Sequence, residues 1–284
     1  MLPRASEPSG LLPAGRAMDT HTARSVLRVR GGLRPAGPSR DELAEEVPVA
    51  LEYNGISHAT MMASPSELED FAVGFSLTEG IVRGVQDIRD VEIVPADGGI
   101  VARLEIASAC LAGLKTRRRA LAGRTGCGLC GVESLEGVLQ ELRPLAAPPR
   151  PVALAAVRGA MAAMRARQRL HDLTGATHAA GWADADGELH LVREDVGRHN
   201  ALDKVAGALA RGGTDGAAGL AVISSRASFE MVQKAAAAGI PVLAAVSAPT
   251  ALAVRLAERA GMALIGFLRQ DDCTLYTHPG HLRG

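Results

Sequence analysis

The last third of the sequence constrains the fold most, because short apolar segments alternate there with segments of helical periodicity. The apolar segments show little polar–apolar alternation and therefore predict buried strands. Strands of this kind, separated by helices, are typical of βαβ units whose sheet is covered on both faces. We expect an α/β domain with a mixed, mostly parallel sheet and helices on both faces. The expected strands are residues 187–195, 219–225, 240–246 and 262–268.

The first half of the chain has a different pattern, which indicates a smaller region of α+β type. Asn54-Gly55 lies between two β-type segments and predicts a hairpin with a two-residue turn. Ser64 and Glu67 have the spacing of a capping box, which predicts a helix that begins at Pro65. The expected organisation is a disordered, Pro/Gly/Ala-rich tail (1–24), an α+β region ending in a Cys-x-x-Cys loop and a helix (25–148), and the α/β domain (149–284).

Charge and hydropathy argue against two classes of protein. Lys+Arg and Asp+Glu are both 31, so a general nucleic-acid binder is not indicated. Residues 235–254 carry no charge and are long enough to span a bilayer. Gly239, Pro241 and Pro249 interrupt this segment, so we interpret it as a helix end, a buried strand and a new helix. Because the N-terminus also lacks a signal-peptide core, we expect a cytoplasmic protein without a membrane span.

Polar residues follow each expected strand and should gather at one edge of the sheet. Ligands of such folds bind at the carboxyl ends of the strands, and helix N-termini and arginines there suit phosphate groups. Taken singly, Asn200, Ser228 and Thr250 are explained equally well as helix caps, and His178 and His199 as structural histidines. No GxxxxGK[ST] motif is present, and the single GxGxxG match, residues 126–131, lies in the cysteine-containing segment rather than between an expected strand and a helix, so neither phosphate-binding loop is indicated. The candidate anion-binding residues are Arg193, Arg198, His199, Ser225, Arg226, Thr250 and Arg269.

The chain has four cysteines, which is too few for a secreted disulfide scaffold and fits a reducing compartment. Cys127 and Cys130 form a Cys-x-x-Cys in the glycine-rich segment RTGCGLCG. A structural zinc needs about four ligands, and the other two thiols, Cys110 and Cys273, are isolated in the sequence. Inert buried thiols fit poorly with the flanking glycines. Preceding arginines and a following helix favour a thiolate, which leaves a group carrier and a redox pair as close alternatives.

Several segments together resemble the formate dehydrogenase accessory sulfurtransferase family, FdhD. The likeness covers roughly residues 27–284, and the segment REDVGRHNALDKV is too long and distinctive for chance agreement. The segments are GCGLCGVESL, THAAG, REDVGRHNALDKV, SSRASFEMVQKAAAAGIPVLAAVSAPTALAV, GFLR and, in the first half, SPSELEDFAVGFSLTEGIV.

The resemblance implies a sulfur carrier and transferase. Such proteins accept persulfide sulfur from a cysteine desulfurase and pass it to the molybdenum cofactor, as bis-molybdopterin guanine dinucleotide, before its insertion into formate dehydrogenase. The persulfide-bearing cysteine maps to Cys127, and Cys130 would assist or resolve. The fold would resemble that of cytidine deaminases, and the protein would be a homodimer with no metal of its own. The cofactor-binding segment, in the 149–284 domain, maps to Phe267, Leu268, Arg269, Gln270, Asp271 and Asp272.

Three rival functions can be compared with these motifs. Zinc-dependent base deamination needs H-x-E and P-C-x-x-C, and neither occurs, so we reject it despite the implied fold. A non-catalytic cofactor chaperone remains open, with thiols that only tether or sense the cofactor. A thiol–disulfide oxidoreductase also remains open, although no thioredoxin-like strand precedes the thiols.

Overall fold

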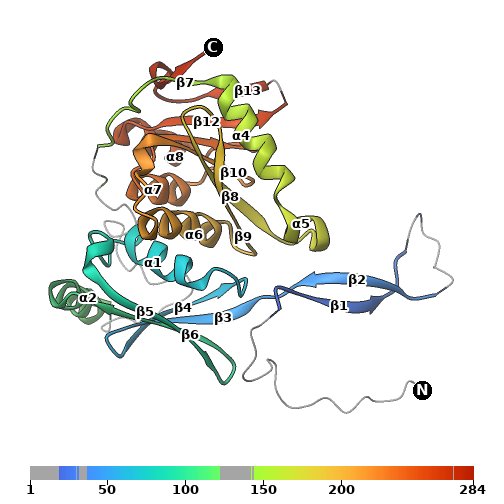
Figure 1. The fold of residues 1–284 in the computed structure, drawn as a ribbon, viewed down its shortest axis with the longest axis vertical. Coiled ribbons are helices and arrows are strands. Elements are labelled where there is room, and N and C mark those ends of the chain that lie inside the picture. Colours follow the sequence, from blue (N-terminus) through green and yellow to red (C-terminus); the bar gives the residue numbers. More distant parts are fainter. Residues whose placement is uncertain (1–18, 30, 32–36, 122–141, 143, 271) are drawn as a thin grey trace.

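The computed structural model describes residues 19–29, 31, 37–121, 142, 144–270 and 272–284 (Figure 1). The C-terminal part contains a six-stranded sheet in the order β13-β12-β11-β10-β8-β9. Its strands are β8 (His178–Asp184), β9 (Leu189–Asp195), β10 (Gly219–Ile223), β11 (Val242–Ala245), β12 (Ala263–Arg269) and β13 (Asp272–Leu275).

The sheet is mixed, but the expectation that it is mostly parallel was wrong. The pairs β10–β11 and β11–β12 are parallel, whereas β8–β9, β8–β10 and β12–β13 are antiparallel. Two strands that the periodicity did not predict cause the difference. β8 and β13 each form an antiparallel pair with a sequence neighbour, as strands joined by short connections do.

Helices cover both faces of this sheet, as expected. Residues of α6 (Arg198–Arg211), α7 (Phe229–Ala237) and α8 (Ala251–Ala260) share one apolar core with the sheet. Residues of α4 (Leu154–Ala166) share a second core with the other face. The remaining elements of this part are β7 (Val152–Ala153) paired with β14 (Leu282–Arg283), α5 (Arg169–Thr174), η2 (Gly216–Ala218) and η3 (Pro279–His281).

The N-terminal part is a four-stranded sheet with a core of its own. The predicted Asn54-Gly55 hairpin is confirmed, because φ is positive at both residues (48° and 76°) between β3 and β4. The sheet order is β4-β3-β6-β5, with the strands β3 (Val47–Tyr53), β4 (Ile56–Ala63), β5 (Ile88–Ala96) and β6 (Gly99–Ile106). Among the described residues, the helices of this part are α1 (Leu68–Thr78), η1 (Val85–Asp87) and α2 (Ser108–Leu121).

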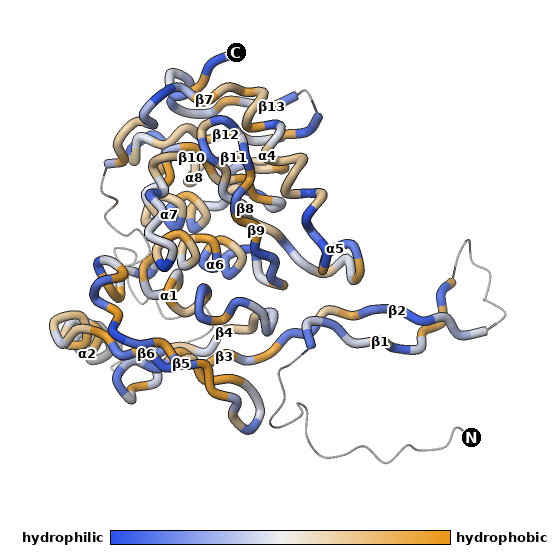
Figure 2. The backbone as a smooth tube through the Cα atoms, viewed as in Figure 1, coloured by the Kyte–Doolittle hydropathy of each residue, from blue (hydrophilic) through white to orange (hydrophobic). Residues whose placement is uncertain are grey.

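A separate two-stranded ribbon, β1 (His21–Val26) with β2 (Ser39–Ala44), extends away from the body of the molecule (Figure 1). Polar and apolar residues mix along it (Figure 2). β1 begins inside the segment that we expected to be a disordered tail, so the ordered chain starts earlier than residue 25. Residues 1–18 lie outside the described residues.

The two parts meet where α1 crosses α6, which places α1 between the two sheets (Figure 1). The crossing is close because both helices carry a glycine at the contact. A Cβ on Gly74 would lie 1.7 Å from the carbonyl O of Asp203, and a Cβ on Gly207 would lie 1.9 Å from that of Asp70. Only glycine permits such an approach of two backbones.

A buried ion pair also joins the two parts. Lys234 Nζ lies 2.9 Å from Asp203 Oδ1 and 2.9 Å from Glu79 Oε1, and Thr78 Oγ1 donates to Asp203. Burial alone would lower the pKa of Lys234, but the carboxylates of Asp203 and Glu79 outweigh it and raise that pKa. Lys234 is therefore charged and links α7 to α1 and α6.

Within the described part of the chain, no helix combines the length and the apolar character that crossing a membrane requires. The uncharged segment 235–254 contains the end of α7, strand β11 and the start of α8, as the sequence predicted.

Candidate functional site

The carboxyl ends of β9, β10, β11 and β12 lie at the same edge of the six-stranded sheet. β8 runs antiparallel to both β9 and β10, so these two point the same way, and β11 and β12 follow β10 in parallel. The same reversal brings the beginning of β8, with His178, to this edge, where it pairs with Asp195. The tertiary structure thus places His178 beside the residues that follow the other strands.

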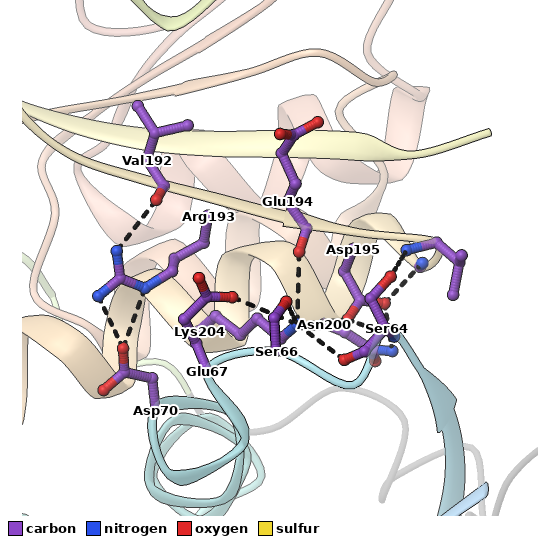
Figure 3. Close-up of polar contacts among 12 residues, drawn as sticks. Ser64, Ser66, Glu67, Asp70, Val192, Arg193, Glu194, Asp195, Asn200 and Lys204 are labelled. Carbon is purple, nitrogen blue, oxygen red and sulfur yellow. Dashed lines mark hydrogen bonds and ion pairs between the residues drawn. The ribbon is translucent and has the colours of Figure 1, made fainter. Parts of the chain in front are cut away.

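The turn from β9 into α6 is held by a buried polar network (Figure 3). Asp195 Oδ1 accepts hydrogen bonds from Gly197 N (2.8 Å) and Asn200 Nδ2 (3.0 Å). Asp195 Oδ2 accepts from Ser64 N (3.0 Å) and lies 2.8 Å from Lys204 Nζ. Both charged side chains of this pair are fully buried.

Ser64 belongs to this network, and the predicted capping box was wrong. Its backbone N–H is bound to Asp195, and its Oγ accepts from Val196 N at 3.1 Å. α1 begins at Leu68, and Glu67 is its N-cap residue with φ 45° and no side-chain cap. Because the Ser64 hydroxyl and backbone N–H bind the β9–α6 turn, this serine does not cap α1.

Arg193 has a partner within the protein. Its Nε and Nη2 both donate to Asp70 Oδ2, at 3.0 and 2.7 Å (Figure 3). Asp70 is buried and also pairs with Arg211 Nη1. This geometry makes Arg193 a link between β9 and α1, and an anion would have to compete with Asp70 for it.

Arg198 and His199 begin α6 and face the first turn of α7. His199 Nε2 lies 2.9 Å from Glu230 Oε2, at ion-pair distance but outside hydrogen-bond geometry. The neighbouring His199 lowers the pKa of Glu230. The buried atoms Arg198 Nε and Ser228 Oγ have no hydrogen-bond partner among the described residues. Unsatisfied buried polar atoms are uncommon, and here they lie at the starts of two neighbouring helices.

His178 is half-buried next to these residues. Burial lowers its pKa, and the positive charge of Arg198 and the neighbouring His171 and His199 lower it further. His178 is therefore neutral at pH 7, with one ring nitrogen able to donate and the other able to accept a hydrogen bond. A neutral imidazole beside cationic groups can exchange a proton at this edge.

The other predicted residues of the edge differ in accessibility. Thr250 caps α8, since its Oγ1 accepts from Ala253 N, which favours the capping alternative for this residue. Ser225 is buried and donates to the carbonyl of Arg226. Leu268 is buried in the core beneath α4. Exposed side chains are Arg226, Phe267, Arg269, Gln270 and Asp272, and Asp271 lies outside the described residues.

The predicted thiols Cys127 and Cys130 also lie outside the described residues. Cys110 is described, in α2, and its environment makes it inert. It is buried, and its Sγ donates to Asp87 Oδ2 at 3.4 Å. Burial raises the pKa of this thiol, and the Asp87 carboxylate raises it further.

Cys110 should therefore react slowly with iodoacetamide at pH 8, because the thiolate is the reactive form and its fraction is small below the raised pKa. Its labelling rate should climb only above the usual thiol range near pH 9. Peptide mapping of timed samples measures this rate against Cys127. Equal labelling of the two thiols at pH 8 would contradict the inert environment.

Sequence reasoning missed Ser64, Lys204 and Glu230 as contributors to this edge. One signal was available for α6. Its residues Asn200, Asp203, Lys204 and Gly207 have the i, i+3, i+4, i+7 spacing of one helix face. This polar face packs against the N-terminal part, whereas the apolar face of α6 packs on the sheet.

Comparisons with known proteins agree with the architecture and identify the family. Residues 44–283 match the model of the FdhD/NarQ family. The sulfur carrier protein FdhD of Bordetella petrii is 64% identical, over 91% of this chain and 93% of that protein. The sulfur carrier protein FdhD of Cupriavidus necator is 57% identical, over 93% and 91%.

A solved structure shares the fold. It is the crystal structure of a protein from Desulfotalea psychrophila described as a formate dehydrogenase accessory protein. The TM-score is 0.73 at 23% identity, and the match covers 93% of this chain and 100% of that chain. The family model and the two closely similar relatives span nearly the whole described chain, and this protein belongs to the FdhD/NarQ family.

Proposed function

We propose that this protein is a sulfur carrier that takes persulfide sulfur from a cysteine desulfurase and delivers it to the molybdenum cofactor destined for formate dehydrogenase. The observation that carries the proposal is the 64% identity to a protein named as a sulfur carrier, together with the Cys-x-x-Cys of Cys127 and Cys130. We place it in the cytoplasm, where thiols stay reduced. A homodimer and a likeness to the cytidine deaminase fold remain predictions from the resemblance.

In the first step, the Cys127 thiolate attacks the outer sulfur of the donor's persulfide. The bond between the donor's two sulfur atoms breaks, and the donor's cysteine leaves as a thiolate. Cys127 then carries the outer sulfur as its own persulfide, and no external oxidant or reductant is needed.

In the second step, Cys130 resolves the persulfide. Its thiolate attacks the Cys127 sulfur and expels hydrosulfide, which is passed to the molybdenum centre. The Cys127–Cys130 disulfide that forms is reset by two electrons from a dithiol reductant.

The acceptor end of the transfer is the sheet edge that carries Arg198, His199 and His178. This edge has two helix N-termini, the exposed Arg226 and Arg269, and buried polar atoms that no other described residue hydrogen-bonds, all of which suit a phosphate-bearing cofactor. The cofactor is bound here as a substrate, on the segment from Phe267 to Asp272. A neutral His178 can supply or take a proton during the exchange.

Intact-protein mass spectrometry tests the proposal. The protein is incubated with a cysteine desulfurase and free cysteine, and its mass is read before and after reduction. A gain of one sulfur atom that a reductant removes is the expected result. No gain with an active desulfurase would reject the carrier and favour a cofactor chaperone. A disulfide that forms without added sulfur and reduces generic substrates would favour an oxidoreductase.

A further inference from the structure

We propose that Asp195 and Lys204 are positioning residues, which fix the β9–α6 turn and thereby aim Arg198 and His199 at the acceptor. The inference rests on the proposed function, because it assigns the turn to the acceptor end of the transfer. It adds that residues of the N-terminal part, 62–66, complete the acceptor end.

Asp195 is saturated by donors on both oxygens. Oδ1 accepts from Gly197 N and Asn200 Nδ2, and Oδ2 accepts from Ser64 N and lies against Lys204 Nζ. The carboxylate of aspartate can accept hydrogen bonds at both oxygens, whereas the amide of asparagine has one acceptor oxygen and one donor nitrogen. The site therefore needs two acceptor oxygens at this position, which asparagine does not provide.

Lys204 ties this carboxylate to both parts of the protein. Its Nζ donates to the carbonyl of Ser64 at 3.2 Å and to that of Glu194 at 3.3 Å. Glu194 is the residue before Asp195, so the end of β9 is held at two successive positions. The ammonium group thus locks β9, α6 and the segment before α1 into one arrangement (Figure 3).

The backbone of the turn is fixed by the same network. Val196 N donates to Ser64 Oγ, and Gly197 N donates to Asp195 Oδ1. The next two residues are Arg198 and His199. A buried ion pair is often no more stabilising than apolar residues of similar volume, so its best-attested benefit is a specified geometry. Here the geometry specified is that of the turn.

A second buried pair provides a matched control. Asp203 and Lys234 lie where α6 and α7 meet α1, also at the contact between the two parts, and are buried to a similar degree as Asp195 and Lys204. The Asp203 carboxylate accepts from Thr78 and Lys234, and in the described part of the chain no hydrogen bond or ion pair joins it to residues 195–199. A variant of either aspartate weakens the interface, but only a variant of Asp195 disturbs the turn.

The experiment compares Asp195→Asn with Asp203→Asn in the full chain, using three readouts. The readouts are the sulfur gain by mass spectrometry, the affinity for GDP as a probe of the acceptor end, and the formate dehydrogenase activity restored to cells that lack the native protein. Activity is normalised to the amount of carrier protein in the cells.

Both variants should load sulfur like the wild type. Asp195→Asn should weaken GDP binding and lower restored activity by roughly tenfold, since misplaced groups lose much of their effect. The GDP affinity and restored activity of Asp203→Asn should stay within about twofold of the wild-type values, because the β9–α6 turn is intact in this variant. Equal GDP affinity and equal activity for the two variants would overturn the positioning role. Failure of the wild type to load sulfur would instead reject the proposed function.

If Asp195→Asn does not fold, Ser64→Ala is the variant that tests the role of the turn. It removes the acceptor of Val196 N and leaves no buried charge unpaired. Its control is Ser76→Ala, because both serines are fully buried and Ser76 binds Tyr53 and Ala72, away from the turn. A several-fold loss of GDP affinity in Ser64→Ala alone is expected, and equal affinity of the two variants would overturn the inference.

Discussion

Cys127→Ala should lose sulfur loading completely, and the formate dehydrogenase activity that it restores in cells should fall by about a hundredfold or more. The reason is that a persulfide forms only on a nucleophilic thiolate, and the substitution removes the proposed carrier. Cys130→Ala should still load sulfur but deliver it slowly, because the resolving thiol is gone. Mass spectrometry measures sulfur loading, and formate dehydrogenase activity in a strain without the native protein measures sulfur delivery.

Cys110→Ala is the matched control for the loss of a thiol. Cys110 is buried against Asp87, and its raised pKa keeps it protonated. This variant should load and deliver sulfur at the wild-type level. Full activity of Cys127→Ala would remove the basis of the carrier mechanism.

Gly207→Ala should lower the free energy of unfolding by about 3 kcal/mol or more. No other addition of one methyl group to α6 should cost as much. The new Cβ would lie 1.9 Å from the carbonyl O of Asp70 and 2.8 Å from Gly74 N, both backbone atoms. α1 and α6 would have to separate, which also strains the contacts of Asp70 and Asp203. Gly74→Ala should act similarly, since its Cβ would lie 1.7 Å from Asp203 O.

Urea unfolding followed by circular dichroism measures this effect. Gly159→Ala in α4 is the control, because a Cβ there meets nothing within 4 Å. It should leave stability unchanged or raise it by up to about 1 kcal/mol, the usual helix-propensity gain of alanine over glycine. A Gly207→Ala protein as stable as Gly159→Ala would show that the helices are not held at backbone contact.

The resemblance to the family was readable from the sequence because its motifs are contiguous. REDVGRHNALDKV covers the end of β9, the turn and most of α6 in one segment. The edge residues also followed from local signals, since apolar strands end at polar turns and helices begin there. The cap at Thr250 was one of the two alternatives that its residue type offers, but the role of Arg193 did not follow, because its partner Asp70 lies 123 positions away.

Strand direction was the part of the fold that local pattern could not supply. The segment that forms β8 contains alanines, a glycine and a tryptophan, with little of the branched apolar character of β10. Its antiparallel pairing depends on strands on either side of it, one of them beyond α6. That pairing brought His178 to the edge and reduced the parallel pairs to two.

The sequence by itself determined strands β9, β10, β11 and β12 with the helices between them, the turns that follow these strands, the pair of thiols and the family. Hydrophobic periodicity, turn residues and contiguous motifs carry this information over short distances along the chain. Only the tertiary structure decided which polar residues became partners. Lys204 donates to Ser64, which is 140 positions away, and Arg193 pairs with Asp70, 123 positions away. Such pairings arise when α1 packs on α6, because burial then requires every charge at the interface to find a partner.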